Sequence, residues 1–322
     1  MSVNAVESST SYGVKLGNVP ILLIFSVGVL LGGCGEKHGG APATPTGDDG
    51  RLRVHAVNYP LAYFAERIGG ERVRVEFPVP GGIDPAFWVP DTEAVLGFQD
   101  ADLVLLNGAG YAAWVDRVTL PTNGLVNTSI GFLGALIPIE DATVHTHGPT
   151  GEHSHGQTAF TTWLDPRLAL EQAGVIRQRL AALRPDAALL FDQGFAALET
   201  DLAGLDAPLA ATAAAIGDRR LLGSHPVYQY LAQRYGLNLR SVHFEPDELP
   251  DDRGWRDLRA LLGEHPAEWM LWESEPLPET IARLRELGIE SIVYDPCGNR
   301  PGSGDFLSVM QDNAAHLARI AE

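Results

Sequence analysis

The feature that most constrains the fold is a repeated alternation between short β-branched runs and segments of helical periodicity, which begins at Arg51. Runs that alternate in this way indicate parallel βαβ units, in which each helix returns the chain to the next strand. We therefore predict an α/β fold. In the first half, the expected strands span 51–57, 73–79 and 102–106, and the expected helices span 61–68 and 92–98.

Two helices with no strand between them interrupt this alternation after Asp165-Pro166, a pair that suits a helix start. The first should end near Leu183, and the second should run over 185–206 with a leucine-rich stripe. The alternation then resumes, so we expect two lobes of parallel βαβ units, joined by a long rigid helix, with a cleft between them. The expected parts are an N-terminal lobe (51–184), a connecting helix (185–217) and a C-terminal lobe (218–322). Within the C-terminal lobe, the expected strands are 219–223, 239–244, 269–272 and 291–294, and the expected helices are 226–235, 255–262, 277–287 and 306–320.

The N-terminal region has the pattern of a bacterial lipoprotein signal. An apolar run over 19–31 is followed by Gly32-Gly33-Cys34, and it is too short to cross a bilayer comfortably. Small residues before a cysteine fit a cleavage site. We predict a signal peptide over 1–33, lipidation of Cys34 and a flexible Gly/Pro/Thr-rich tether over 34–50. This would anchor the protein outside the cytoplasm, on the periplasmic cell envelope.

The charge and cysteine content narrow the possible partners. A formal net charge of −18 disfavours nucleic acid and anionic lipid faces, which need basic patches, and it favours cations. The two cysteines are Cys34 and Cys297. If Cys34 is lipidated, Cys297 has no partner, so neither a disulfide framework nor a cysteine-rich zinc motif is expected.

Three candidate metal ligands follow expected strands of the second half. Ligands of open parallel sheets bind at the carboxyl ends of the strands, where the sequence places His225, Glu273 and Asp295. An imidazole and two carboxylates suit a hard or borderline divalent cation. Taken singly, however, His225 also fits a helix cap, and Asp295 also fits a turn.

A second histidine cluster lies in the Gly/Pro-containing loop 143–157. Neutral imidazoles bind zinc or copper, so we expect an auxiliary metal contact there, weakened by the entropy of ordering a loop. The cluster comprises His145, His147, His153 and His155. The other histidines are scattered, and we expect structural roles for His38, His55, His243, His265 and His316.

Short motifs at loops and helix starts connect the chain to a known family. They are Tyr59-Pro60-Leu61 with Gly69-Gly70, Gly82-Ile83-Asp84-Pro85 with Pro90, Ala101-Asp102-Leu103 with Asn107-Gly108, Trp163-Leu164-Asp165-Pro166, Ser224-His225 with Tyr230-Leu231 and Arg234–Leu237, and Tyr294-Asp295-Pro296. With these motifs, the chain from about Arg51 to Glu322 resembles the metal-binding solute receptors of zinc- and manganese-type bacterial ABC importers.

The resemblance implies a lipid-anchored, monomeric receptor. It would hold a divalent metal between two α/β lobes and deliver it to an ABC permease of the inner membrane. Zinc is the favoured cargo, ahead of manganese, and the loop 143–157 falls where zinc-type members carry a histidine-rich loop. The family is not catalytic. An enzyme with Cys297 as nucleophile and His225 as base is also disfavoured because the segment 295–300 offers no activating helix start.

Two family ligand positions are altered in this chain. The resemblance implies a histidine directly after Asp84-Pro85, where this chain has Ala86, and another two residues before Trp163, where it has Thr161. The other two positions are kept as His225 and Asp295. Three interpretations stay open: the histidine loop replaces the lost imidazoles, Glu273 and a first-lobe group such as His55 form a different site, or the protein binds a non-metal ligand or a protein partner.

Overall fold

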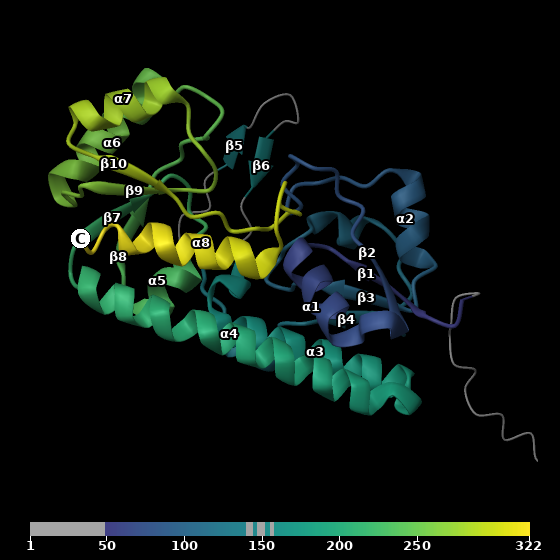
Figure 1. Cartoon of the computed structure of the whole chain (residues 1–322). Helices are drawn as coiled ribbons and strands as arrows, with labels where there is room; N and C mark the ends of the chain where they lie inside the picture. The colour runs from purple at the N-terminus through teal and green to yellow at the C-terminus, as the bar shows by residue number, and fades with distance from the viewer. Residues whose placement is uncertain (1–48, 140–143, 147–151, 155–157) are drawn as a thin grey trace, which may run out of the picture. The chain divides into compact units, whose positions relative to one another are not determined.

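The computed structural model describes residues 49–139, 144–146, 152–154 and 158–322, and it contains two parallel four-stranded sheets (Figure 1). In the first sheet the order is β2-β1-β3-β4. Its central strand β3 is almost wholly buried, as parallel sheets favour, whereas β1 buries alternate residues. We call this sheet with its helices the first lobe. Its elements are β1 Leu52–Ala56, α1 Tyr59–Gly69, β2 Val73–Glu76, α2 Thr92–Gln99, β3 Leu103–Leu106 and β4 Leu125–Asn127.

The second sheet has the order β10-β9-β7-β8 and is also parallel. Read from β8, this order repeats that of the first sheet, so the two lobes share a topology where the sequence showed only a similar rhythm. We call this sheet with its helices the second lobe. Its elements are β7 Arg220–Gly223, α5 Gln229–Tyr235, β8 Asn238–Ser241, α6 Asp252–Glu264, β9 Trp269–Trp272, α7 Pro278–Glu286, β10 Glu290–Val293 and α8 Phe306–Ala318.

Two helices connect the lobes: α3 (Pro166–Leu183) and the 29-residue α4 (Ala188–Ile216). Figure 1 shows α4 running alongside α3 and then α8, and it also packs on α1 and α5. The predicted long connecting helix is thus confirmed, although it continues beyond 206. Pro208 lies inside α4 and removes one backbone donor. Burial of Leu209, Ala213 and Ile216 holds the helix together past that point.

The remaining differences from expectation are local. β4 was not predicted, and α5 begins at Gln229 instead of Pro226 because the Val227 N–H donates to the His225 carbonyl in a tight turn. β5 (Val144–Thr146) and β6 (Glu152–Ser154) form an antiparallel pair. Short 3-10 helices span Gly70–Arg72, Ala113–Arg117, Ile130–Ala135, Thr162–Leu164 and Pro185–Ala187.

The N-terminal targeting features are outside what the structure describes. The predicted signal peptide, Cys34 and nearly all of the tether precede residue 49. Among the helices of the described part, none is both long and apolar enough to cross a membrane.

Candidate cation site

Each strand of the second sheet leads into a residue that can bind a metal. His225 follows β7, Glu273 follows β9 and Asp295 follows β10, as predicted, while His243 and Glu245 follow β8. β7 and β9 are neighbours at the point where the strand order reverses, which is where open α/β sheets bind ligands. The topology therefore gathers these side chains at one edge of the sheet.

His225 is the centre of this group. Its Nδ1 lies 3.3 Å from Glu245 Oε1 and 3.8 Å from Glu273 Oε1. Its ring meets that of His243 edge-on, with centroids 5.4 Å apart. His225 is only 5% exposed, whereas the two carboxylates keep about a quarter of their surface (28% and 27%). The imidazole is thus fixed beneath carboxylates that solvent can reach.

Sequence reasoning missed His243 because it placed the end of β8 too late, and it passed over Glu245 although the expected strand 239–244 left that residue directly at its end. A strand over 239–244 would keep His243 inside the sheet, but β8 ends at Ser241. Beyond the end of β8, the N–H groups of Val242 and Phe244 still donate to the carbonyls of Gly223 and Ser224 at the end of β7. The His243 side chain between them is exposed. The Glu245-Pro246 pair is a usable signal, since proline ends a strand and leaves the preceding residue at its edge.

Asp295 is held by its own turn. One carboxylate oxygen accepts the N–H of Cys297 at 2.7 Å, and its own N–H donates to Asn313 Oδ1 at 2.9 Å. Burial raises its pKa above the usual range, and its charge also raises the pKa of Glu273. Asp295 therefore lies within electrostatic reach of Glu273, with one oxygen already used for its own turn.

The acidic groups of the site disfavour one another's ionisation. Burial, followed by neighbouring carboxylates, raises the pKa of Glu245 to about 7. Burial and the charges of Asp84, Glu245 and Asp295 raise the pKa of Glu273 well above its usual value. Like charges that shift one another in this way would be relieved by a bound cation.

Asp84 is a first-lobe carboxylate whose charge contributes to the raised pKa of Glu245 and Glu273. The sequence presented it as part of a family motif and not as a ligand. Its Oδ1 accepts the Ala86 N–H at 2.8 Å. The loop around it is tied to the second lobe, because the Asn299 amide donates to the carbonyls of Pro80 and Ile83 at 2.8 and 2.7 Å. These bonds position Asp84 near the segment that follows Asp295.

The two altered family positions have structural contacts in this chain. Ala86 is buried, with 7% of its surface exposed. The Thr161 hydroxyl donates to the Val227 carbonyl, and the nearby Trp163 Nε1 donates to the Pro296 carbonyl at 2.7 Å. Both bonds join segments of the two lobes, so the region around Thr161 ties the lobes together.

The other predicted residues lie apart from this group. His55 packs on Phe98 of α2, with ring centroids 5.0 Å apart, and burial lowers its pKa. The structure does not bring it to Glu273. His265 and His316 bond to backbone carbonyls of Leu221 and Val293, which are structural roles.

The histidine-rich loop is described only at its two short strands, where His145 pairs with His153 in the register of β5 and β6. His147 and His155 lie outside the described residues. Within the described ranges, no three histidine, cysteine, aspartate or glutamate side chains already form a metal-binding group.

Cys297 is buried, which raises the pKa of its thiol and makes it a poor nucleophile.

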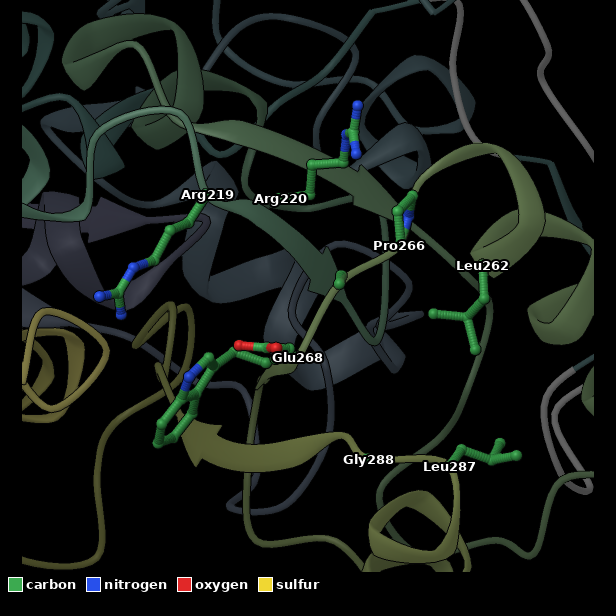
Figure 2. Close-up of a pocket in the computed structure, with 9 residues that line it drawn as sticks. Arg219, Arg220, Leu262, Pro266, Glu268, Leu287 and Gly288 are labelled. Carbon is green, nitrogen blue, oxygen red and sulfur yellow. The ribbon is translucent and has the colours of Figure 1, made fainter.

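A pocket of about 500 Å³ opens at the opposite edge of the second sheet, where β7 and β9 begin (Figure 2). Arg219, Arg220 and Glu268 contribute its charged groups, and its other lining residues include Leu262, Trp269 and Leu287. Two guanidinium groups against one carboxylate disfavour a cation. The concave pocket and the candidate cation site are therefore different places.

Comparisons with known proteins agree with one another. The family model for the periplasmic zinc-uptake complex component A (ZnuA) matches residues 54–320. The zinc-binding lipoprotein AdcA of Streptococcus pneumoniae is 24% identical over 287 residues, covering 85% of this chain and 56% of AdcA. The high-affinity zinc uptake system protein ZnuA of Bacillus subtilis is 25% identical over 283 residues, covering 85% of this chain and 87% of that protein.

Solved structures share the fold. The Zn(II)-bound ZnuA-like domain of S. pneumoniae AdcA matches with a TM-score of 0.72 at 22% identity, covering 84% of this chain and 99% of that domain. A crystal structure of ZnuA matches with a TM-score of 0.68 at 22% identity, covering 84% of this chain and 100% of that one. The chain thus spans about half the length of the full AdcA relative.

Proposed function

The chain belongs to the ZnuA family of metal-binding solute receptors from zinc ABC importers, and from this premise we propose that it captures Zn²⁺ at the His225 group. Proteins of this family bind solutes and are not enzymes. We further propose that the captured ion is delivered to an ABC permease. Capture followed by delivery requires a site that solvent can reach, in keeping with the partly exposed carboxylates.

The observation that carries this proposal is the placement of His225 against Glu245 and Glu273, both within 4 Å of its Nδ1. Imidazole nitrogen and carboxylate oxygen are ligands of Zn²⁺. The carboxylates also repel one another, so a divalent cation would offset a cost that is present in the empty protein. Asp295 offers one more oxygen at the same sheet edge.

The predicted lipid on Cys34 adds a delivery role. A receptor tethered to the membrane that holds its permease works at high effective concentration, which compensates for modest affinity. AdcA, one of the relatives, is itself described as a zinc-binding lipoprotein. We therefore propose that this protein lies on the cell envelope, next to an inner-membrane permease.

Equilibrium dialysis of the full chain against Zn²⁺, followed by elemental analysis, tests the proposal. We expect one tightly held zinc ion per chain. If no divalent ion is retained at micromolar concentration, the proposal fails. That result would favour a member of the family that binds a non-metal ligand or a protein, as the altered positions Ala86 and Thr161 would allow.

The affinity for Zn²⁺ should depend on pH below neutrality. The pKa of Glu245 is raised to about 7, so at lower pH the metal must displace its proton. We expect the affinity to rise by up to about tenfold per pH unit for each displaced proton between pH 5.5 and 7, and less steeply above. Titration calorimetry in buffers of different ionisation enthalpy measures the released protons. A flat profile in that range would contradict a role for Glu245.

The metal-free protein should show the opposite trend. A carboxyl whose pKa is raised in the folded state favours folding when it is protonated. Its contribution is therefore lost as pH rises from the unfolded value near 4.5 through the folded value near 7. Urea unfolding with a chelator present should give a midpoint that falls over this range, and saturating Zn²⁺ should reverse the fall.

A further inference from the structure

A short second-lobe segment, residues 296–300, is bonded along its length to the first lobe. Its backbone carbonyls accept hydrogen bonds from first-lobe donors, and one of its side-chain amides donates to first-lobe carbonyls. These bonds run from Trp163 Nε1 to the Pro296 carbonyl (2.7 Å), from the Tyr59 N–H to the Gly298 carbonyl (2.9 Å) and from the Asn299 amide to the carbonyls of Pro80 (2.8 Å) and Ile83 (2.7 Å). The segment is therefore seated on the first lobe although it follows the last strand of the second.

The rest of this segment is held in one shape. The Arg300 guanidinium lies over the Tyr59 ring, 4.9 Å from its centroid, and its Nη2 lies 3.5 Å from Glu66 Oε1. Cys297 has a φ of 56°, a left-handed conformation that is costly for residues other than glycine. Such a conformation persists only where the surrounding structure fixes it. The bonds on both sides of Cys297 supply that restraint.

A second set of bonds joins the lobes next to His225. The Thr161 hydroxyl donates to the Val227 carbonyl, and the Tyr230 hydroxyl donates to the Ala159 carbonyl at 3.0 Å. Thr161 and Tyr230 are only 3% and 1% exposed, so water does not compete for these bonds. The Val227 N–H in turn donates to the His225 carbonyl. This set therefore ties the first lobe to the turn that carries His225.

Both sets of bonds meet the first lobe at its altered family positions. One set contains Thr161 itself, and the other ends on Ile83, three residues before Ala86. A cation held by ligands from both lobes would join the lobes at these two places. In this chain, hydrogen bonds between the lobes occur there instead.

We propose that the two sets of bonds form a clasp that holds the lobes together with or without metal, and that a cation binds to the second lobe without drawing the lobes together. The carboxylates within 4 Å of His225 Nδ1, those of Glu245 and Glu273, belong to the second lobe, as His225 does. A ligand that makes the same contacts in two arrangements of a protein does not shift the balance between them. The clasp itself does not rest on the proposed function, because it can be tested in the metal-free protein.

The Cys297 thiol can report on the clasp, because it lies inside the 296–300 segment and is only 2% exposed. A buried thiol is alkylated when the structure around it opens, so its rate follows the population of the open form. The test is alkylation of the full chain by iodoacetamide with a chelator present, followed at Cys297 by peptide mass spectrometry, which separates it from Cys34. We expect Asn299→Ala and Thr161→Val each to raise this rate by about tenfold or more, because each removes hydrogen bonds of the clasp. Replacing the chelator by Zn²⁺ should change the wild-type rate by less than about twofold.

Asn238→Ala is the matched control for Asn299→Ala. Asn238 is an exposed asparagine at the start of β8, on the opposite edge of the second sheet, and its loss should leave the rate within about twofold. Thr161→Val keeps the shape of the side chain and lies outside the segment that carries Cys297, so a faster rate in this variant indicates separation of the lobes. The proposal is overturned if both variants react like the wild type, or if the wild type reacts slowly only when Zn²⁺ is bound.

The affinity for Zn²⁺ gives a second readout that separates the clasp from the metal site. Because His225 and its neighbouring carboxylates belong to one lobe, Asn299→Ala and Thr161→Val should bind Zn²⁺ within about threefold of the wild type in titration calorimetry. A loss of about tenfold or more in both would mean that the ion bridges the lobes. This would overturn the inference and leave zinc capture at His225 standing. If the wild type binds no divalent ion, the proposed function fails, and the alkylation rates in chelator still decide whether the clasp exists.

Discussion

Replacing His225 with alanine should lower the affinity for Zn²⁺ by about 100-fold or more, because it removes the imidazole around which the other groups are arranged. Even the loss of a residue that only supports a metal ligand typically costs 10- to 100-fold. Glu245 and Glu273 both lie within 4 Å of His225 Nδ1, so the variant leaves carboxylates that repel each other without the buried imidazole that both of them face. Titration calorimetry with Zn²⁺ on the full chain measures the change.

Two companion variants test whether the loss of affinity is specific to His225. His316→Asn is the control, since an asparagine amide can keep the hydrogen bond to the Val293 carbonyl, and it should bind Zn²⁺ like the wild type. Deletion of residues 145–155 removes the histidine-rich segment and should lower affinity much less than His225→Ala. If the deletion abolishes binding while His225→Ala does not, the loop is the metal site and the strand-end site is wrong.

Gly194→Ala should destabilise the fold by about 2–3 kcal/mol through steric overlap between α4 and α1. A Cβ at this position would lie 2.7 Å from the carbonyl oxygens of Arg67 and Ile68, and 2.9 Å from the Ile68 Cα. These are backbone atoms and cannot rotate away. The two helices must therefore separate, and the packing of α1 on α4 near Phe191 and Leu198 weakens.

Gly204→Ala is the matched control in the same helix, because its Cβ would meet nothing within 4 Å. It should stabilise the protein by about 0.5–1 kcal/mol, since alanine is the better helix former. The shift of the urea midpoint at constant slope measures both effects. Equal shifts of the two variants would show that α1 and α4 do not pack as closely as the structure has them.

Much of the fold was predictable because local periodicity carries it. The buried strands are short and aliphatic, as in the Leu-Val-Leu-Leu run of β3, and helices begin at recognisable caps such as Asn58 and Asp165. The prediction was wrong where tertiary packing overrides local preference. The leucine-rich run was expected only over 185–206, yet α4 continues past Pro208 because its last turns bury apolar side chains. β8 ends at Ser241, although the β-branched and aromatic pattern runs on to Phe244.

The sequence by itself determined the α/β class, the long connecting helix and the strand-end positions of His225, Glu273 and Asp295. It could do so because parallel strands place their carboxyl ends at one edge, whatever the loops do. Only the tertiary structure decided that His243 and Glu245 lie against His225. Loop conformation depends on contacts between distant segments, such as the Asn299 bonds to Pro80 and Ile83, and no local pattern encodes such contacts.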